Sequence, residues 1–407
     1  MAVVASLPGF EPHAACVAPP AAQSERLARL RLARSENVGP RSFLHLIERF
    51  GTAVVALDAL PDLAAAGGRR GYVVCPTAAA EDEVLTGEAA GASLVLLGDA
   101  AYPARLLSIG SPPPALWMLG DPGVLTAPAV AVVGARNASA LGLRQARRLG
   151  QALAEAGQLV VSGLARGIDH AAHEGALAAA GPGASTTVAV LPGGIDRVYP
   201  EEHLPLVRRI ADAGGAVIAE APPGTEPRSR HFPRRNRLVS GLSDGVVIVE
   251  AAERSGSLIT ARSALDQGRE VMACPGAPED PRAAGCNSLI REGAALIRDL
   301  SDVLEALEPL RSRGFSEGTD AFDFGGSGFD AAFDTGDDFE VSLEEGGDDA
   351  ALAEQVIALL GAAPVEIDEI ARLTGAAPAQ LSLVLLELDL AGRVDVLPGG
   401  LVAERRM

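Results

Sequence analysis

Short, continuous apolar runs alternate with amphipathic stretches through the middle of this 407-residue chain. The runs are Val130–Val133, Leu159–Val161, Thr187–Leu191, Ala216–Ala219, Val246–Val249 and Val271–Ala273. A strand buried on both faces has this continuous pattern. Between the runs, residues 139–156, 168–180 and 202–213 have helical spacing, and a last helix is expected near 301–307. The alternation predicts an α/β fold with a doubly wound, mostly parallel sheet.

Residues 24–67, which precede this region, read as a small helical domain. SERLARLRLAR has helical spacing, a Val-Gly-Pro turn follows at 38–40, and Arg41–Phe50 forms a second amphipathic helix that ends at Gly51. The pattern resembles a helix-hairpin-helix or a sterile-alpha-motif-like domain, and both DNA contact and a purely structural helical cap stay open. Strands are expected at 72–75 and 94–97. We treat residues 68–308 as the central domain with its N-terminal extension.

The pattern of residues 350–407 is that of a winged helix. Helices are expected at 350–360, 365–373 and 378–391, and strands at 394–397 and 401–403. The helix in the recognition position, PAQLSLVLLELDLAGR, carries Glu387 and Asp389 and no basic residue before Arg393. Reading a major groove requires basic and polar side chains there. The sequence therefore favours a protein-contact or regulatory winged helix over a reader of duplex DNA.

Charge is distributed unevenly along the chain, whose formal net charge is −19. Residues 309–350 hold 12 acidic residues and 2 arginines, while 128–308 carry about −2. We expect residues 1–23 and the acidic, Phe-dotted linker 309–349 to be disordered. The linker reads as a plain spacer, with docking of its Phe residues on a partner, or imitation of nucleic acid, as alternatives. Every basic residue is Arg, which binds phosphate in a bidentate way and stacks on bases.

Several classes of protein are disfavoured by composition. No apolar run approaches 18 residues, so no membrane insertion is expected, and the N-terminus lacks the basic start of a secretion signal. The four cysteines, Cys16, Cys75, Cys274 and Cys286, show no CxxC spacing, which disfavours zinc and a disulfide framework. These features predict a cytoplasmic protein of two or three domains.

Two motifs place candidate phosphate-binding groups at the ends of the first two central strands. VAVVGARNAS (130–139) carries Arg136 beside the start of a helix, a position that suits one phosphate, and the missing GxGxxG spacing disfavours NAD. In VVSGLARGIDHAAHEGAL (160–177), Ser162 and Gly163 offer backbone N–H groups, Arg166 adds charge, and Asp169 is expected to cap the helix.

The second motif also admits two sharper hypotheses. His170, His173 and Glu174 could form a metal site, but no further ligand group from another segment is evident. A Ser162–His173–Asp169 triad would require coincidences of folding that the sequence does not show. We therefore predict no metal, no cofactor and no catalytic residue.

Four further motifs complete the series: LPGGIDRVYP (191–200), RHFPRRNRLVSGLSD (230–244), VVIVEA (246–251) and RSGSLITA (254–261). Gly193 and Gly194 let a strand end pass close to backbone or ligand. Ser255, Gly256 and Ser257 lie at a helix N-terminus, an anion site by geometry. Phe232 lies among arginines that include Arg230, where a stacking ring would hold a single strand without sequence preference. The alternative is that Phe232 packs under the loop while the arginines form ion pairs.

The order and spacing of these six motifs resemble the DNA-processing protein A family (DprA, also called Smf). The resemblance covers about residues 95–307 and includes GDAAYPARLL (98–107) and PPPALWMLGD (112–121), where Trp117 is expected to pack the extension. It implies a Rossmann-like domain in which Phe232, Arg235 and Asn236 match strand-contacting positions and Arg237 belongs to the recurring RNR. It also implies binding and protection of single-stranded DNA, loading of the recombinase RecA in natural transformation, and a homodimer without enzymatic activity.

Two other classes of function stay open at this stage. LPGGIDRVYP is similar to the PGGxGT loop of nucleoside-monophosphate phosphoribohydrolases, but Ile195-Asp196 replaces Gly-Thr and the following Glu is missing. A nucleotide-processing enzyme of that kind is the main alternative. The third class is a transcription regulator that uses the winged helix.

Overall fold

The computed structural model describes residues 20–179, 187–312, 348–360, 363–397 and 400–405. The chain divides into two compact units. Among the described residues, unit 1 holds 82–312, and unit 2 joins residues 20–81 to the residues from 348 onward. The predicted disordered segments, 1–23 and 309–349, lie mostly outside the described residues. Where they are described they are helical: α1 begins at Pro20, α12 ends at Ser312 and α13 begins at Asp348.

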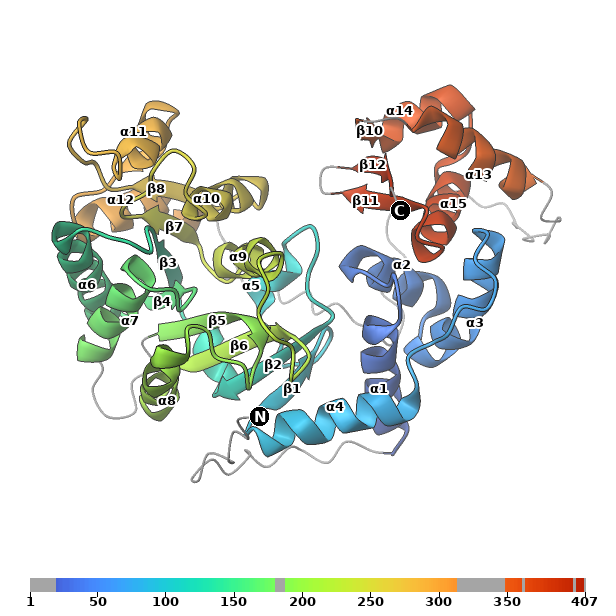
Figure 1. The fold of residues 1–407 in the computed structure, drawn as a ribbon, viewed down its shortest axis with the longest axis horizontal. Helices are drawn as coiled ribbons and strands as arrows, with labels where there is room; N and C mark the ends of the chain where they lie inside the picture. The colour runs from blue at the N-terminus through green and yellow to red at the C-terminus, as the bar shows by residue number, and fades with distance from the viewer. Residues whose placement is uncertain (1–19, 180–186, 313–347, 361–362, 398–399, 406–407) are drawn as a thin grey trace. The chain divides into compact units, whose positions relative to one another are not determined.

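Unit 1 is built on a sheet whose described strands follow the order β1-β2-β6-β5-β4-β3-β7-β8-β9 (Figure 1). The strands from β6 to β9 are parallel, and β1 and β2 add an antiparallel edge. Their bounds are β1 Ser93–Leu96, β2 Ala115–Gly120, β3 Ala129–Val133, β4 Leu159–Ser162, β5 Thr187–Gly194, β6 Ala216–Ala221, β7 Gly245–Ile248, β8 Glu270–Ala273 and β9 Ala295–Leu296. The doubly wound sheet predicted from the apolar runs is confirmed. Its direction of winding reverses at β3, between β4 and β7.

Helices cover both faces of this sheet. The crossovers through α6 (Ala140–Glu155), α7 (Ile168–Ala179) and α8 (Leu204–Asp212) all progress from β3 toward β6, so their right-handedness places these helices on one face. The chain then returns through α9 (His231–Gly241) and α10 (Ser257–Asp266), which pack on the other face. The remaining elements of the unit are α4 (Thr77–Ala89), α5 (Ala104–Leu107), η1 (Pro122–Thr126), η2 (Glu201–His203), α11 (Ala284–Arg291) and α12 (Leu300–Ser312).

The N-terminal extension departs from the sequence prediction at one point. Residues 72–75 do not form a strand; the backbone of Cys75 bonds to side chains instead, since the Ser35 hydroxyl accepts from its N–H and Arg31 donates to its carbonyl. The expected strand near 94–97 is present as β1. Trp117 packs the extension as predicted, since it is fully buried and its indole N–H donates to Glu83 at 2.9 Å.

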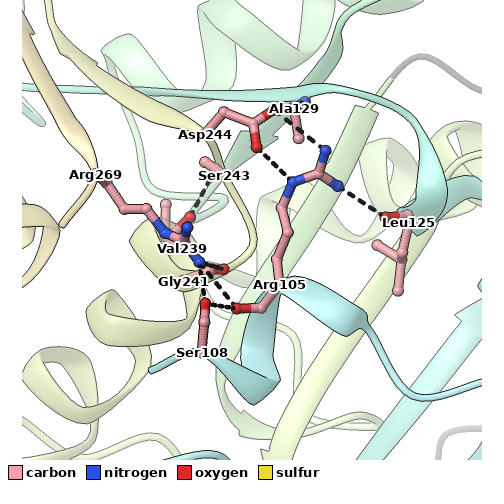
Figure 2. Close-up of polar contacts among 9 residues, drawn as sticks. All are labelled: Arg105, Ser108, Leu125, Ala129, Val239, Gly241, Ser243, Asp244 and Arg269. Carbon is pink, nitrogen blue, oxygen red and sulfur yellow. Dashed lines mark hydrogen bonds and ion pairs between the residues drawn. The ribbon is translucent and has the colours of Figure 1, made fainter. Parts of the chain in front are cut away.

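A polar network fixes the end of α9 that lies at the amino ends of the parallel strands (Figure 2). Arg105 makes a bidentate pair with Asp244 at 2.7 and 3.2 Å, and Asp244 also accepts the Ala129 N–H at the start of β3. Arg269 donates to the carbonyl oxygens of Arg105 and Gly241. These bonds fix the extension, the end of α9 and the starts of β3 and β7 relative to one another. The opposite end of α9 lies at the candidate site.

Unit 2 contains the small helical domain and the winged helix that the sequence predicted. The helices α1 (Pro20–Arg34), α2 (Pro40–Phe50) and α3 (Ala53–Ala66) come from the N-terminal part of the chain. The winged helix consists of α13 (Asp348–Leu359), β10 (Val365–Glu366), α14 (Ile367–Thr374), α15 (Pro378–Leu390), β11 (Val394–Leu397) and β12 (Leu401–Glu404). Its strands pair in the order β10-β12-β11. Among the described residues, no single helix has the length and apolar character of a membrane span; α14 and α15 reach them only when taken together, across a bend of 115°.

Candidate nucleic-acid interface

The loops that follow β3, β4 and β7 meet where the winding of the sheet reverses, and they enclose a cavity of about 810 Å³. Crevices at the carboxyl ends of strands at such a point are the usual ligand sites of doubly wound folds. The N-terminal halves of α9 and α10 complete the walls. Eight of the predicted site residues line the cavity: Arg136, Gly163, Phe232, Arg235, Asn236, Ser255, Gly256 and Ser257.

The loop that carries Arg136 is held in place by Glu250, the acidic residue of the VVIVEA motif. Its carboxylate accepts from the backbone N–H of Ser139 at 2.8 Å and from the Ser139 hydroxyl, which itself caps α6 through the Gly142 N–H. The backbone carbonyl of Glu250 accepts from the Ala135 N–H at 2.7 Å. Glu250 therefore ties the loop after β3 to the loop after β7 and fixes the base of Arg136.

Arg136 and Phe232 form a stacked pair at this cavity. The guanidinium carbon of Arg136 lies 4.7 Å from the centre of the Phe232 ring, and the Tyr199 ring meets Phe232 edge-on at 5.7 Å. Arg136 is exposed and Phe232 is half-buried. In the described part of the chain, neither Arg136 nor the neighbouring Arg254 pairs with a carboxylate. An unpaired cation on an accessible aromatic ring offers a phosphate partner and a base-stacking surface side by side.

Helical rotation sends the side chains of the RRNR segment in α9 in different directions. Arg234 and Arg237 both pair with Glu220 on β6, at 3.1 and 2.6 Å. Arg235 instead enters the floor of the cavity, where it is only 6% exposed and donates to the carbonyl oxygens of Gly163 and Val190. A Cβ on Gly163 would overlap this guanidinium, which explains the glycine. Arg235 thus joins α9 to the carboxyl ends of β4 and β5.

Arg235 lies near a second buried charge, Asp169, in the first turn of α7. Burial lowers the pKa of Arg235 to about 10 and raises the pKa of Asp169, and the charge of each residue opposes the shift of its neighbour. Arg235 therefore remains charged at neutral pH. The Asp169 carboxylate also accepts from the backbone N–H of Gly163 at 3.1 Å and of Ala165 at 3.4 Å. The Gly163 N–H that we expected to be available to a ligand is taken up by this contact.

The start of α10 forms the wall opposite the loop after β4. Asn236 donates from its amide nitrogen to the Gly256 carbonyl at 3.3 Å, which links α9 to α10. The hydroxyls of Ser255 and Ser257 lie 2.7 Å apart at the helix N-terminus. This arrangement places two hydroxyls and the positive end of the α10 dipole beside the cavity, which suits an anion. The first backbone N–H groups of the helix, of Ser257, Leu258 and Ile259, already donate to the Ser255 hydroxyl and to the carbonyls of Ser255 and Gly256.

Six predicted site residues lie outside the cavity lining. Ser162 is fully buried and its hydroxyl donates to the Val132 carbonyl at 2.7 Å. Arg166 forms an exposed ion pair with Glu202, and Arg237 is directed into the protein by Glu220 and the Ser111 carbonyl. Arg230 is exposed and contacts His231. Gly193 and Gly194 are buried at the end of β5, where a Cβ would crowd the backbone of residues 222–227. Their close approach is to backbone.

The histidines of the second motif take structural positions. His173 is fully buried and its Nδ1 lies 2.7 Å from the Thr187 hydroxyl, while His170 stacks on His203 at 4.6 Å. Glu174 pairs with Arg209. Neither the proposed metal group nor the Ser162–His173–Asp169 triad is assembled by these contacts.

Polar residues outside the predicted set also line the cavity, among them Asn137, Ser229, Arg254 and Arg282. Arg254 and Asn137 directly adjoin predicted positions within the same motifs, so motif membership could have identified them. Arg282 comes from a loop after β8 that carries no motif, and it pairs with Asp280 at 3.0 Å. Nothing in the local sequence indicated that this loop reaches the cavity.

The doubly wound sheet with a cavity at its switch point defines an α/β protein of the Rossmann-like type. The family model for DNA recombination-mediator protein A matches residues 93–308. The models for the DprA-like N-terminal HHH domain and the DprA winged helix domain match 23–85 and 345–400. The chain belongs to this DNA recombination-mediator protein A family, as the order of its motifs predicted.

Individual proteins are similar to this chain over different parts of its length. Protein Smf of Escherichia coli strain K12 is 38% identical over 305 residues, which cover 75% of each chain. The X-ray structure of DNA processing protein A from Streptococcus pneumoniae matches with a TM-score of 0.56 and 34% identity, over 69% of this chain and 96% of that one. DNA processing protein A from Helicobacter pylori, described for its single-stranded DNA binding mode, matches at 28% identity with a TM-score of 0.47, over 54% of this chain and 97% of that one.

Proposed function

We propose that the cavity binds single-stranded DNA without sequence preference. The observation that carries this proposal is the stacked Arg136–Phe232 pair, 4.7 Å apart, beside the Ser255 and Ser257 hydroxyls. A guanidinium and a helix N-terminus suit consecutive phosphates, and an aromatic ring suits any base because every base has a π face. This combination neutralises the backbone without reading base edges.

The same geometry favours single strands over duplex. A base reaches Phe232 only after it leaves its own stack, which an unpaired strand does at low cost and a duplex does at the cost of breaking a base pair. The ring also lies within a cavity and not on a flat surface. Duplex DNA would therefore contact the rim alone and gain only phosphate interactions.

We assign no catalytic step to the cavity. Ser162 is committed to the Val132 carbonyl and His173 to the Thr187 hydroxyl, so neither of them is available as a nucleophile or a base. The phosphoribohydrolase alternative is weakened further by Gly193 and Gly194, which approach backbone and not the cavity. We therefore propose a binding protein and not an enzyme.

Membership of the family supports three further proposals. We propose that the chain acts in the cytoplasm during natural transformation, that it loads RecA recombinase onto the strand it protects, and that it works as a homodimer. The family resemblance in the motifs from 130 to 261 is the basis for all three.

The proposal is tested by the affinity of the Arg136→Glu variant for a fluorescent single-stranded oligonucleotide. We expect a loss of more than about 1 kcal/mol, because a phosphate contact is replaced by repulsion and an ordinary surface interaction contributes less. Arg148→Glu is the matched control, since it makes the same charge change at an exposed position of α6 outside this cavity. Equal losses in the two variants would show that only net charge matters and that the cavity is not the site.

A further inference from the structure

The recognition helix of the winged helix, α15, is apolar on more than one face. Leu381, Val384, Leu385 and Leu388 face the core of the winged helix itself. On the rest of the helix, Leu386 is 6% exposed, Glu387 8% and Leu390 0%, although none of the three belongs to that core. Side chains that are buried outside this core have to be covered by another part of the protein. A second surface must therefore pack on α15.

That second surface comes from α2 and α3 of the same unit. A Cβ on Gly67, at the end of α3, would overlap the carbonyl oxygen of Glu387, so the two backbones are in close contact. The Ser42 hydroxyl donates to the Asp389 carboxylate at 2.6 Å, and the Asn37 amide donates to the Leu390 carbonyl at 2.9 Å. Specific polar bonds thus surround an apolar contact.

The contact also includes the wing. Arg41 donates to the Leu397 carbonyl at the end of β11, and Arg405, beyond β12, donates to the Asn37 side chain at 2.8 Å. The N-terminal helices therefore contact both parts of a winged helix that normally meet DNA, the recognition helix and the wing strands. The residues that form these two bonds are 356 and 368 positions apart in the chain.

We propose that the α2–α3 surface is the dedicated partner of the recognition helix, and that this winged helix binds protein and not duplex DNA. The charges support this assignment. The covered side of α15 carries Glu387 and Asp389 and no arginine, so it would repel the phosphates of a groove. The two ends of the chain form one module, with unit 1 inserted between them along the sequence. This inference does not depend on the proposed DNA-binding function of unit 1.

Gly67 offers a selective way to test the contact. Its φ is −70° and its ψ is 0°, a conformation that any residue adopts, so a side chain there clashes with α15 without straining α3. The matched control is Ala66→Leu, which adds the same side chain at the neighbouring, exposed position of α3. The full-length protein would carry a specific protease site inserted within residues 313–347, and gel filtration after cleavage would report whether the winged helix stays attached.

We expect the cleaved wild-type and Ala66→Leu proteins to elute as one species that contains both fragments, and cleaved Gly67→Leu to release at least ten times more winged-helix fragment. Gly67→Ala should give an intermediate release, although alanine is the better helix former and would stabilise α3 taken alone. Release from the wild type, or full retention in Gly67→Leu, would overturn the proposal. So would sequence-specific duplex binding that appears in Gly67→Leu only, because α15 would then be a masked DNA reader.

Discussion

At the scale of single residues, burial separates arginines that look equivalent in the sequence. Arg136 is exposed on the Phe232 ring, whereas Arg235 is buried under the cavity and bonded to the carbonyls of two strands. In our proposal the first contacts the strand, and the second holds the floor of the cavity in place. Substitutions at the two positions should therefore have different effects.

We expect Arg235→Leu to lower the free energy of unfolding by about 3–5 kcal/mol, because Asp169 would be left as a buried charge without its compensating cation. Arg136→Leu should change the same free energy by less than about 0.5 kcal/mol, as exposed substitutions usually do. Urea titrations of both variants measure the difference. Similar losses at the two positions would contradict the division between ligand contact and floor.

Phe232→Ala should weaken binding of a single-stranded oligonucleotide by roughly 1–3 kcal/mol, the contribution of one base stacked on an aromatic ring. Phe232→Leu keeps apolar bulk and removes the aromatic face, so it should lose most of the same affinity. Fluorescence anisotropy at one fixed salt concentration compares the three proteins. If Phe232→Leu binds like the wild type, the ring packs against protein and does not stack on a base.

At the scale of elements, the position of α9 is set at both of its ends. Arg235 and Asn236 hold the end at the cavity, and the Arg105–Asp244–Arg269 network holds the other (Figure 2). A helix fixed at both ends presents Phe232 in one orientation. The stability of the site therefore depends on contacts far from the cavity.

Arg105→Met should lower the free energy of unfolding by about 2–4 kcal/mol, somewhat less than for a fully buried pair, since Arg105 and Asp244 keep 18% and 23% side-chain exposure. The control is Arg298→Met, which breaks a surface ion pair with Asp302 and should cost much less. Chemical denaturation distinguishes the two. Equal costs would mean that the network in Figure 2 is not a structural anchor.

His173 between α7 and β5 should make stability depend on pH. Burial lowers the pKa of His173 to about 3 from 6.5, so the folded protein keeps it neutral while the unfolded chain takes up a proton below about pH 6.5. The free energy of unfolding should then fall as the pH drops from 6.5 toward 3, by up to about 1.4 kcal/mol per pH unit from this group. His173→Gln should remove that part of the slope in denaturant titrations at several pH values. An unchanged slope would assign the acid sensitivity to other groups.

Patterning was sufficient to predict the central parallel strands, because a strand buried on both faces is apolar along most of its length, as β3 and β7 are. Residues 72–75 show where this fails: Tyr72, Val73 and Val74 are typical of a strand, but the backbone of Cys75 that follows them bonds to the side chains of Arg31 and Ser35. The local sequence pattern also did not predict the direction in which a side chain points. Arg237 turns inward only because Glu220 and Ser111, distant in sequence, accept its hydrogen bonds.

At the scale of the whole molecule, the C-terminal part of the chain has two separate effects. Its negative charge disfavours DNA, and its winged helix covers an apolar surface. Residues 309–407 carry −14 of the net −19, so their field disfavours DNA at low ionic strength. The winged helix in the same segment covers α2 and α3, an apolar surface that water would otherwise meet. Removing the segment has two separable consequences.

A chain truncated after residue 308 should bind single-stranded DNA at least as tightly as the full chain at low salt, and its α2–α3 amides should exchange hydrogen faster because their apolar cover is gone. Filter binding and hydrogen exchange measure the two effects on the same sample. Loss of binding with intact circular dichroism would place a DNA site in residues 309–407. Unchanged exchange in α2–α3 would contradict the contact with α15.

The central claim is that the cavity at the switch point holds an unpaired strand through its phosphates and one stacked base. The most direct test measures the affinity of the full-length protein for one oligonucleotide as a single strand and as a duplex, over a series of salt concentrations. We predict tighter binding of the single strand at every salt concentration, with affinity that falls as salt rises because phosphate neutralisation releases counterions. Equal affinity for the two forms, or no binding at low salt, would contradict the claim.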